Sequence, residues 1–181
     1  MDEAYFRDYC GYGDYDSQYL FHSGIQHCME VIDRYALDVR SVLVLGAATG
    51  QVLGHFEAEL DLVPHGCELS EWAHARIPER YRPSIARADM REYVPQQLEL
   101  GHRFDLCFTN ALIYLQEKDI PPLLRDVASM CRYLHLASST EEFYEPGDTY
   151  VTLLKPRTWW REQLLEAGFR GTRSPYLWRV A

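Results

Sequence analysis

The sequence predicts an α/β fold, a doubly wound and mostly parallel sheet with helices on both faces. Short aliphatic runs alternate along the chain with segments of helical periodicity, as in repeated strand and helix units. A turn of small residues, 46–50, joins the first aliphatic run to the first helical segment. The chain has 181 residues, 47% of them hydrophobic, which is enough for one core and few for two.

Residues 1–40 are expected to form an N-terminal arm and helix, within the same domain as the core, residues 41–181. Five tyrosines recur every three or four residues between positions 5 and 19. Gly11 and Gly13 interrupt this pattern, which favours an irregular aromatic arm over a helix. From Ser17 to Leu37 the apolar residues fall at helical spacing, so we expect one long helix there.

Three strands are predicted in the first half of the core. Val42–Leu45 is an unbroken branched-aliphatic run, as expected of a strand buried on both faces, and Gly50–Leu60 predicts the helix after it. Val63–Leu69 predicts the second strand. Ser70, a favourable N-cap, begins a helix expected to reach about Tyr81, and Ser84–Ala88 predicts the third strand.

The second half continues the alternation. Phe104–Thr109 predicts a strand, Asp119–Met130 a helix and Tyr133–Ser138 a fifth strand. Pro156 opens a helix that stops at Gly168, because proline is favoured at a helix start and glycine just after its end. Residues 169–180 predict an antiparallel hairpin around Ser174-Pro175.

Composition excludes several classes of protein. The 27 acidic residues outnumber the 18 basic ones, and the net charge of −9 argues against a nucleic-acid partner. The longest apolar run, Val42–Ala48, is far shorter than the roughly 20 residues of a membrane-spanning helix. The acidic, aromatic N-terminus does not resemble a signal peptide, so we expect a cytoplasmic protein. Oligomeric state is left open.

No structural metal is expected. The five cysteines are widely spaced without a Cys-x-x-Cys pair, and the histidines do not cluster. Cys67 and Cys107 lie in apolar runs and are expected to be buried thiols. His135 is expected to be a hydrogen-bonded core residue, Asp105 a structural one, and the arginines between positions 76 and 91 a solvated face.

The turn after the first strand, Leu45-Gly46-Ala47-Ala48-Thr49-Gly50, predicts a ligand site. Small residues let the backbone approach a ligand, and the helix that follows presents unpaired amides. Glu68 lies 18 residues beyond Gly50, at the end of the second strand, where a carboxylate can accept both hydroxyls of a ribose. Together these features predict an adenosine-containing cofactor.

One candidate cofactor is a nicotinamide dinucleotide. It normally requires Gly-x-Gly-x-x-Gly, and this turn has Ala48 at the middle glycine. Tyr114 and Lys118 have the Tyr-x-x-x-Lys spacing that short-chain dehydrogenases use for hydride chemistry. A short-chain dehydrogenase is therefore kept as an alternative.

The other candidate is S-adenosylmethionine, because five segments resemble, in order, the motifs of class I S-adenosylmethionine-dependent methyltransferases. The segments are Val42–Gly50, Cys67–Ser70, Ala88–Met90, Phe104–Asn110 and Trp160–Phe169. The resemblance implies a seven-stranded sheet in the order 3-2-1-4-5-7-6 with a reversed C-terminal hairpin. It also implies a methyltransferase (EC 2.1.1), with S-adenosylhomocysteine as product.

The resemblance assigns residues to the cofactor as well. Those expected to bind it are Tyr15, Gly46, Ala47, Ala48, Gly50, Glu68, Leu69, Asp89, Met90 and Asn110. The glycine turn would line the methionine moiety, and Glu68 would accept the ribose hydroxyls. Leu69 and Met90 would pack on adenine, and Asp89 would accept its amino group. Val44 and Ala48 depart from the family, which often has an acidic residue and a glycine there.

Catalytic candidates follow from the needs of methyl transfer. The reaction needs an in-line approach, a shielded site and, for an O–H or N–H nucleophile, sometimes a base. His22, Asn110 and Tyr114 lie in segments expected near the strand ends. The N-terminal arm and the loop 140–155 are expected to close over the site.

The acceptor is predicted only by class. The core leaves the arm and one loop to build the acceptor site, so we expect a small metabolite or a carrier-presented group, methylated on O, N or C. The residues after Asn110 lack the Pro-Pro motif of DNA adenine methyltransferases. A non-catalytic methyltransferase-like binding module is the other alternative.

Overall fold

The computed structural model describes residues 1, 3–7, 15, 24–137, 140–142 and 148–181. Its sheet has seven strands in the order β3-β2-β1-β4-β5-β7-β6, which confirms the predicted topology. The strands are β1 (Val42–Leu45), β2 (His65–Glu68), β3 (Ile85–Arg87), β4 (Phe104–Thr109), β5 (Cys131–Leu136), β6 (Phe169–Gly171) and β7 (Leu177–Val180). Strand β7 runs antiparallel to both of its neighbours, and β1 to β5 are parallel.

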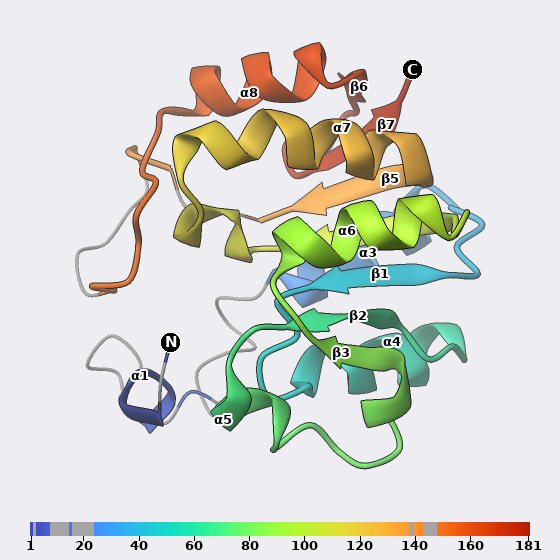
Figure 1. Ribbon diagram of the computed structural model, residues 1–181. Helices are drawn as coiled ribbons and strands as arrows, with labels where there is room; N and C mark the ends of the chain where they lie inside the picture. The colour runs from blue at the N-terminus through green and yellow to red at the C-terminus, as the bar shows by residue number, and fades with distance from the viewer. Residues whose placement is uncertain (2, 8–14, 16–23, 138–139, 143–147) are drawn as a thin grey trace.

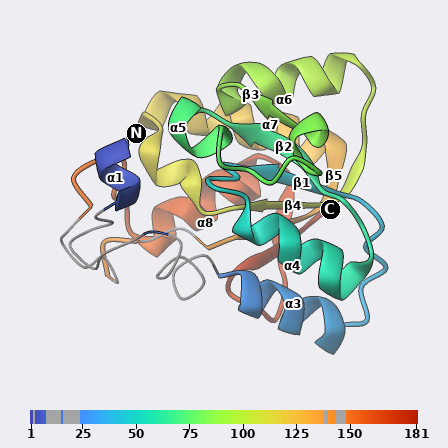
Figure 2. The same cartoon turned by 90° about the horizontal axis from the view of Figure 1, so that it is seen from below.

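Helices cover both faces of the sheet, as Figures 1 and 2 show. One face carries α3 (Ile25–Arg34), α4 (Gln51–Leu60) and α5 (Glu71–His74), and the other α6 (Met90–Glu99), α7 (Ile120–Met130) and α8 (Arg157–Glu166). A short N-terminal helix, α1 (Glu3–Arg7), lies beyond the carboxyl ends of the strands. The described part also has 3-10 turns η2 (Arg82–Ser84), η3 (Ala111–Tyr114) and η4 (Glu117–Asp119).

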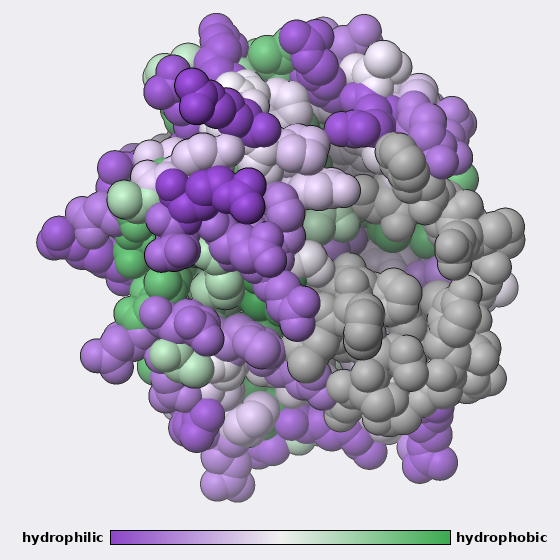
Figure 3. All heavy atoms as spheres, turned by 180° about the vertical axis from the view of Figure 1, so that it is seen from behind, coloured by the Kyte–Doolittle hydropathy of each residue, from purple (hydrophilic) through white to green (hydrophobic). Residues whose placement is uncertain are grey.

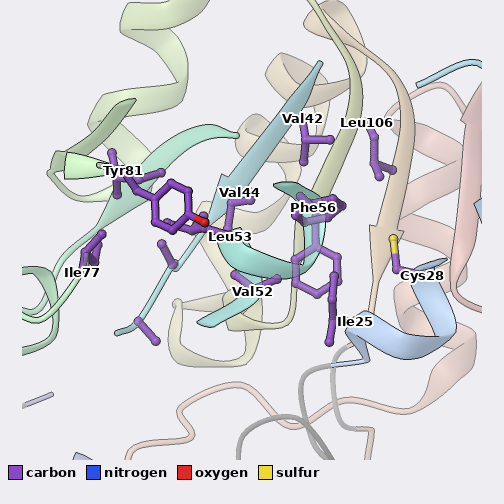
Figure 4. Packing of buried hydrophobic residues seen from close by; sticks show 14 of the residues in the cluster. Ile25, Cys28, Val42, Val44, Val52, Leu53, Phe56, Ile77, Tyr81 and Leu106 are labelled. Atoms are coloured by element: carbon purple, nitrogen blue, oxygen red, sulfur yellow. The ribbon is translucent and has the colours of Figure 1, made fainter. Parts of the chain in front are cut away.

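Strand β1 lies at the centre of two hydrophobic cores. Val42 and Val44 point to the side of α3 and α4, toward Phe56 (Figure 4). Phe56 packs edge-on against Phe108, with ring centroids 5.6 Å apart. Leu43, on the opposite face, belongs to the core under α6, α7 and α8. All four residues of β1 are buried, which confirms the prediction of a strand covered on both faces.

Gly66 of β2 is required by its contact with β1. A Cβ atom at this position would overlap the carbonyl oxygen of Val44 and lie 2.9 Å from its carbonyl carbon. The two strands are therefore held at a spacing that no other residue type allows.

Several predicted boundaries were wrong by a few residues. Strand β5 is Cys131–Leu136 rather than 133–138. The predicted helix 70–81 ends at His74. Pro78 disfavours helical backbone at Ile77, so the helix does not continue to Tyr81. Ser70 is confirmed as its N-cap, since its Oγ accepts the N–H of Ala73 at 3.2 Å.

Helix α6 was missed by the sequence analysis. Only Tyr93 and Val94 are buried in it, and Pro95 lies inside it, so its apolar stripe is too short to show a period. The helix is instead specified by its cap, because the Asp89 carboxylate accepts the N–H of Arg91 at 2.9 Å.

The helix predicted for residues 17–37 is described only from Ile25 to Arg34. It follows Gly24, whose φ is +70°, and Ala36 has a φ of +47° just beyond its end. Residues 16–23 lie outside the described part. At the other end of the chain, Gly168 has a φ of +99° directly after α8 and confirms the predicted helix stop.

Much of the back of the molecule carries hydrophilic side chains, shown purple in Figure 3, between smaller hydrophobic patches. Among the described residues, no helix combines the length and the apolar character needed to cross a membrane.

Candidate functional site

The turn between β1 and α4 brings the backbone close to the carboxyl ends of the strands. Gly46, Ala48 and Gly50 have φ angles of +82°, +49° and +89°. The amides of Gly46 and Ala47 both donate to the Cys67 carbonyl, at 3.0 and 3.1 Å. A Cβ atom at Gly46 would lie 2.8 Å from that of Ala111, so only glycine fits at this position of the turn.

Glu68 is a buried carboxylate fixed by two backbone donors. Its Oε2 accepts the amide of Ala48 and its Oε1 that of Ser70, both at 2.7 Å, and only 5% of the residue is exposed. Burial raises the pKa of this carboxyl, and the two amides act in the opposite direction. Each oxygen keeps acceptor capacity, so the carboxylate is oriented to accept two further hydroxyls.

A cavity of about 240 Å³ opens beside this carboxylate. Its lining residues include five of the predicted cofactor residues, namely Gly46, Glu68, Leu69, Asp89 and Met90. The Leu69 side chain is 60% exposed, which is unusual for leucine and leaves an apolar surface for a planar ligand. A cavity with apolar walls and acceptors at two sides fits an adenosine moiety.

Asp89 is paired with an arginine that the sequence analysis placed on a solvated face. Arg91 Nη2 lies 2.6 Å from Asp89 Oδ2, and its Nη1 lies 3.1 Å from Asp119 Oδ2. The Arg91 guanidinium holds the pKa of Asp89 below its usual value. Arg91 also lines the cavity, and it is exposed, as the expectation of a solvated face predicts.

A second, smaller cavity of about 40 Å³ continues the first, with which it shares five lining residues. It is lined by Met1, Tyr5, Phe6, Tyr15, Gly46, Ala48, Glu68, Asn110, Ala111 and Tyr114. The predicted residues Tyr15, Ala48, Asn110 and Tyr114 thus meet at the ends of β1 and β4. Ala47 and Gly50 are not among the lining residues of either cavity; they shape the turn. His22 lies outside the described residues.

Helix α1 packs over this region through its aromatic side chains. Phe6 stacks on Trp72 of α5, with ring centroids 5.3 Å apart and planes at 11°. Tyr5 is edge-on to Tyr114 at 6.2 Å and to Tyr150 at 5.1 Å. The N-terminal helix therefore bridges both halves of the carboxyl edge.

A chain of hydroxyl groups ends in a carboxylate beside the smaller cavity. Tyr114 donates its hydroxyl proton to Asp148 Oδ2 at 2.6 Å. The Tyr5 hydroxyl lies 2.7 Å from that of Tyr114. Because Tyr114 has one proton, which it gives to Asp148, Tyr5 is the donor in its bond with Tyr114. The order of donation is Tyr5, Tyr114, Asp148.

The segment that carries Asp148 is tied to the end of η3. Asp148 Oδ1 accepts the amide of Tyr150 at 2.9 Å. Thr152 donates its amide to the Ile113 carbonyl at 3.0 Å and its hydroxyl to the Leu115 carbonyl at 2.9 Å. Asp148 was missed by the sequence analysis, because it lies 34 residues from Tyr114 and no local pattern marks it.

Among the residues expected to be structural, Asp105 is confirmed. It accepts from the Arg40 amide and from Arg132, at 2.9 and 3.0 Å, away from both cavities. Cys67 and Cys107 are buried, also as predicted. Within the described ranges, no group of three histidine, cysteine or acidic residues could hold a metal ion.

His135 differs from its expectation. It is fully buried, its Nε2 lies 3.1 Å from Nδ1 of His27, and its ring stacks on Phe108. Its own Nδ1 has no hydrogen-bond partner among the described residues, so the prediction of a satisfied core histidine was only half right.

Comparison with known proteins gives similarity in structure alone. No protein-family model and no curated protein sequence matches the chain. Streptomyces venezuelae DesVI matches with a TM-score of 0.72 at 15% identity, over 92% of this chain and 97% of that one. The sugar N-methyltransferase KedS8 from a Streptoalloteichus species matches with a TM-score of 0.67 at 18% identity, over 94% and 96%. A magnesium protoporphyrin IX methyltransferase from Synechocystis reaches 0.67 at 15% identity, over 98% and 97%.

The chain has the class I S-adenosylmethionine-dependent methyltransferase fold. Its strand order, 3-2-1-4-5-7-6, differs from the order 3-2-1-4-5-6 of the classic nicotinamide-dinucleotide fold. The side chains agree, because Tyr114 donates to Asp148 and Lys118, its supposed partner in hydride chemistry, is exposed.

Proposed function

We propose that the protein is an S-adenosylmethionine-dependent methyltransferase that acts on a small-molecule acceptor. The observation that carries the proposal is Glu68, a buried carboxylate held by the Ala48 and Ser70 amides at the mouth of a continuous cavity. S-adenosylmethionine, when bound, supplies an electrophilic methyl group. S-adenosylhomocysteine is the product.

The chain's own residues divide the binding between them. Glu68 would accept the ribose hydroxyls, and Asp89 the adenine amino group, with its remaining lone pairs beside Arg91. Leu69 and Met90 would cover the purine. Gly46 would let the methionine moiety approach the backbone, with Asn110 at the end of β4 facing the methyl group.

Acceptor chemistry follows from the hydroxyl chain. A protonated amine must lose a proton to expose its lone pair. The Tyr114 oxygen can take that proton while the Tyr114 hydroxyl proton moves to Asp148 along their 2.6 Å hydrogen bond. The tyrosine rings and the carboxylate also suit a cationic group before it is deprotonated. We therefore favour an amine nitrogen over oxygen or carbon. KedS8, one of the compared structures, is named as a sugar N-methyltransferase and supports this choice.

The arm and helix of residues 1–40 would act as a lid within the same domain. Phe6 and Tyr15 are nearly fully buried against the site, and Tyr5 links α1 to Tyr114. Water would be excluded from the acceptor once this lid is closed, which favours transfer to the acceptor over side reactions.

Calorimetry with S-adenosylmethionine and S-adenosylhomocysteine tests the proposal. We expect both to bind, and Glu68→Ala to weaken binding at least about a hundredfold, because two charge-assisted hydrogen bonds are lost. Glu71→Ala, an exposed glutamate three residues on, is the matched control and should bind normally. A folded wild-type protein that binds neither ligand would contradict the proposal.

A second candidate is a binding module without turnover. Val44, where the family often has an acidic residue, is fully buried in the core and offers nothing to a ligand amine. Product binding without any methyl transfer to a broad panel of amines, thiols and alcohols would favour this candidate.

A further inference from the structure

Another cavity lies at the same edge of the sheet, beside the C-terminal hairpin. It has a volume of about 420 Å³ and lies between the first turns of α8 and the ends of β6 and β7. None of its lining residues lines either cavity of the candidate cofactor site.

Two arginines give this cavity its charge. Arg157 and Arg161 are four residues apart on α8, so they share one face of the helix, and both line the cavity and are exposed. The side chain of Arg161 makes no ion pair or hydrogen bond within the described ranges. Glu142 accepts the backbone amide of Arg157 at 3.1 Å, so a ligand would meet the guanidinium groups rather than the helix end.

The cavity is built largely from the C-terminal segment, of whose basic residues Arg157 and Arg161 line it. Residues 155–181 hold six basic and two acidic residues, while the whole chain has a net charge of −9. Two arginines four residues apart on a helix can both donate to one anion placed between them.

The remaining walls suit a planar or apolar body attached to the anion. Tyr176 and Trp178 line the hairpin side, and Tyr176 is 43% exposed. Trp160, which is 4% exposed, also lines the cavity, and its buried Nε1 has no hydrogen-bond partner among the described residues. A ligand acceptor atom would satisfy this donor.

The cavity is placed to hold the far end of a molecule that reaches the methyl site. Leu136 lines it and pairs in register with Thr109, the residue before Asn110. The Leu136 amide donates to the Tyr176 carbonyl at 2.9 Å. Neighbouring strands lie about 5 Å apart, so two strand spacings, about 10 Å, separate the end of β4 from the hairpin wall.

We propose that this cavity binds an anionic group, a carboxylate or a phosphate, carried by the methyl acceptor. The proposal rests on the proposed function for its acceptor, and on Arg157, Arg161 and the aromatic walls for its ligand chemistry. The acceptor would then be bifunctional, with its nucleophile near Asn110 and its anion between the two arginines.

Tryptophan fluorescence tests the cavity without turnover, because Trp160 and Trp178 line it. Phenyl phosphate and phenylacetate are the probes for the two anions, and benzyl alcohol is the uncharged control. We expect at least one anion to change the fluorescence saturably, and Arg161→Gln to weaken its binding at least tenfold. Arg157→Gln should act in the same direction. Arg34→Gln, on α3 at the opposite face of the sheet, should change nothing.

Parallel calorimetry with S-adenosylhomocysteine separates the two proposals. We expect its affinity to be the same in all three arginine variants and the anion to bind equally well in its presence. Failure of both anions to bind, equal binding of benzyl alcohol, or unchanged binding in both cavity variants overturns the anion site. Competition between anion and product, or anion binding by a protein that does not bind the product, overturns its assignment to the acceptor. If the anion site behaves as expected but the protein binds neither S-adenosylmethionine nor S-adenosylhomocysteine, the proposed function is contradicted.

Discussion

The two halves of the sheet's carboxyl edge are built by different means. At the ends of β1 and β2, backbone groups form the site: residues with positive φ angles shape the turn, and backbone amides hold Glu68 by hydrogen bonds. At the ends of β4 and β5, side chains from distant segments meet, such as Tyr5, Tyr114 and Asp148. The first half is therefore fixed by local sequence, and the second by tertiary packing.

This difference decides what the sequence could predict. The glycine turn, Glu68 and the Ser70 cap come from short contiguous motifs with a local physical cause, and the strand order follows from the family resemblance that such motifs carry. Asp148 and Tyr5 reach Tyr114 across 34 and 109 residues, and no spacing rule connects them. Helix α6 was not predicted for a related reason. Its cap at Asp89 is local, but only two of its residues are buried, which is too few to show a helical period.

The largest expected effect is a loss of stability in the half of the edge that is built from backbone groups. Gly66→Ala should lower the free energy of unfolding by about 3 kcal/mol, because its Cβ would overlap the Val44 carbonyl in the centre of the sheet. Gly54→Ala is the matched control, since it lies inside α4 with its nearest neighbour 3.8 Å away. It should gain up to about 1 kcal/mol from helix propensity. Urea unfolding measures both, and equal effects would contradict the account of Gly66.

The next largest effect is a loss of stability at acidic pH, and it arises in the half of the edge that is built from side chains. Burial, together with the nearby His27, lowers the pKa of His135 to about 3, while the unfolded chain titrates near its ordinary value. His135 therefore stays neutral in the folded state at a pH where it is protonated in the unfolded state. The free energy of unfolding decreases as the pH falls below about 6.5. Between pH 7 and 5 this loss should be about 2 kcal/mol. His27, whose pKa burial also lowers, adds a contribution of the same sign.

Unfolding of His135→Leu across the same pH range checks this origin. The variant removes a buried nitrogen without a partner among the described residues, so it should cost little at pH 7 and lose less stability than the wild type at pH 5. Parallel pH profiles for the two proteins would assign the acid sensitivity to other groups.

A smaller effect links the two halves. Removal of residues 1–16 takes away Tyr5, Phe6 and Tyr15, which line the smaller cavity. The affinity for S-adenosylhomocysteine should fall about tenfold, close to 1.4 kcal/mol, while the circular dichroism of the sheet and its helices is kept. An unchanged affinity would show that α1 serves the acceptor half alone.

The smallest effect sharpens the description of the turn. Ala48 has a φ of +49°, a conformation that costs a residue with a Cβ atom about 1 kcal/mol. Ala48→Gly relieves this strain but gives the unfolded chain more freedom, so we expect a net gain of about 0.5 kcal/mol or less. Product affinity should change by less than about threefold. Thermal unfolding and calorimetry measure the two quantities, and a clear destabilisation would contradict the left-handed turn.

Hydrogen exchange with and without S-adenosylhomocysteine tests the central claim most directly, because it maps the cofactor onto one half of the edge. The account predicts slower amide exchange in residues 46–50, 68–70 and 88–91 when the product is added, with residues 157–161 and 174–178 unchanged. No protection in the first three segments, or protection confined to α8 and the hairpin, would contradict it.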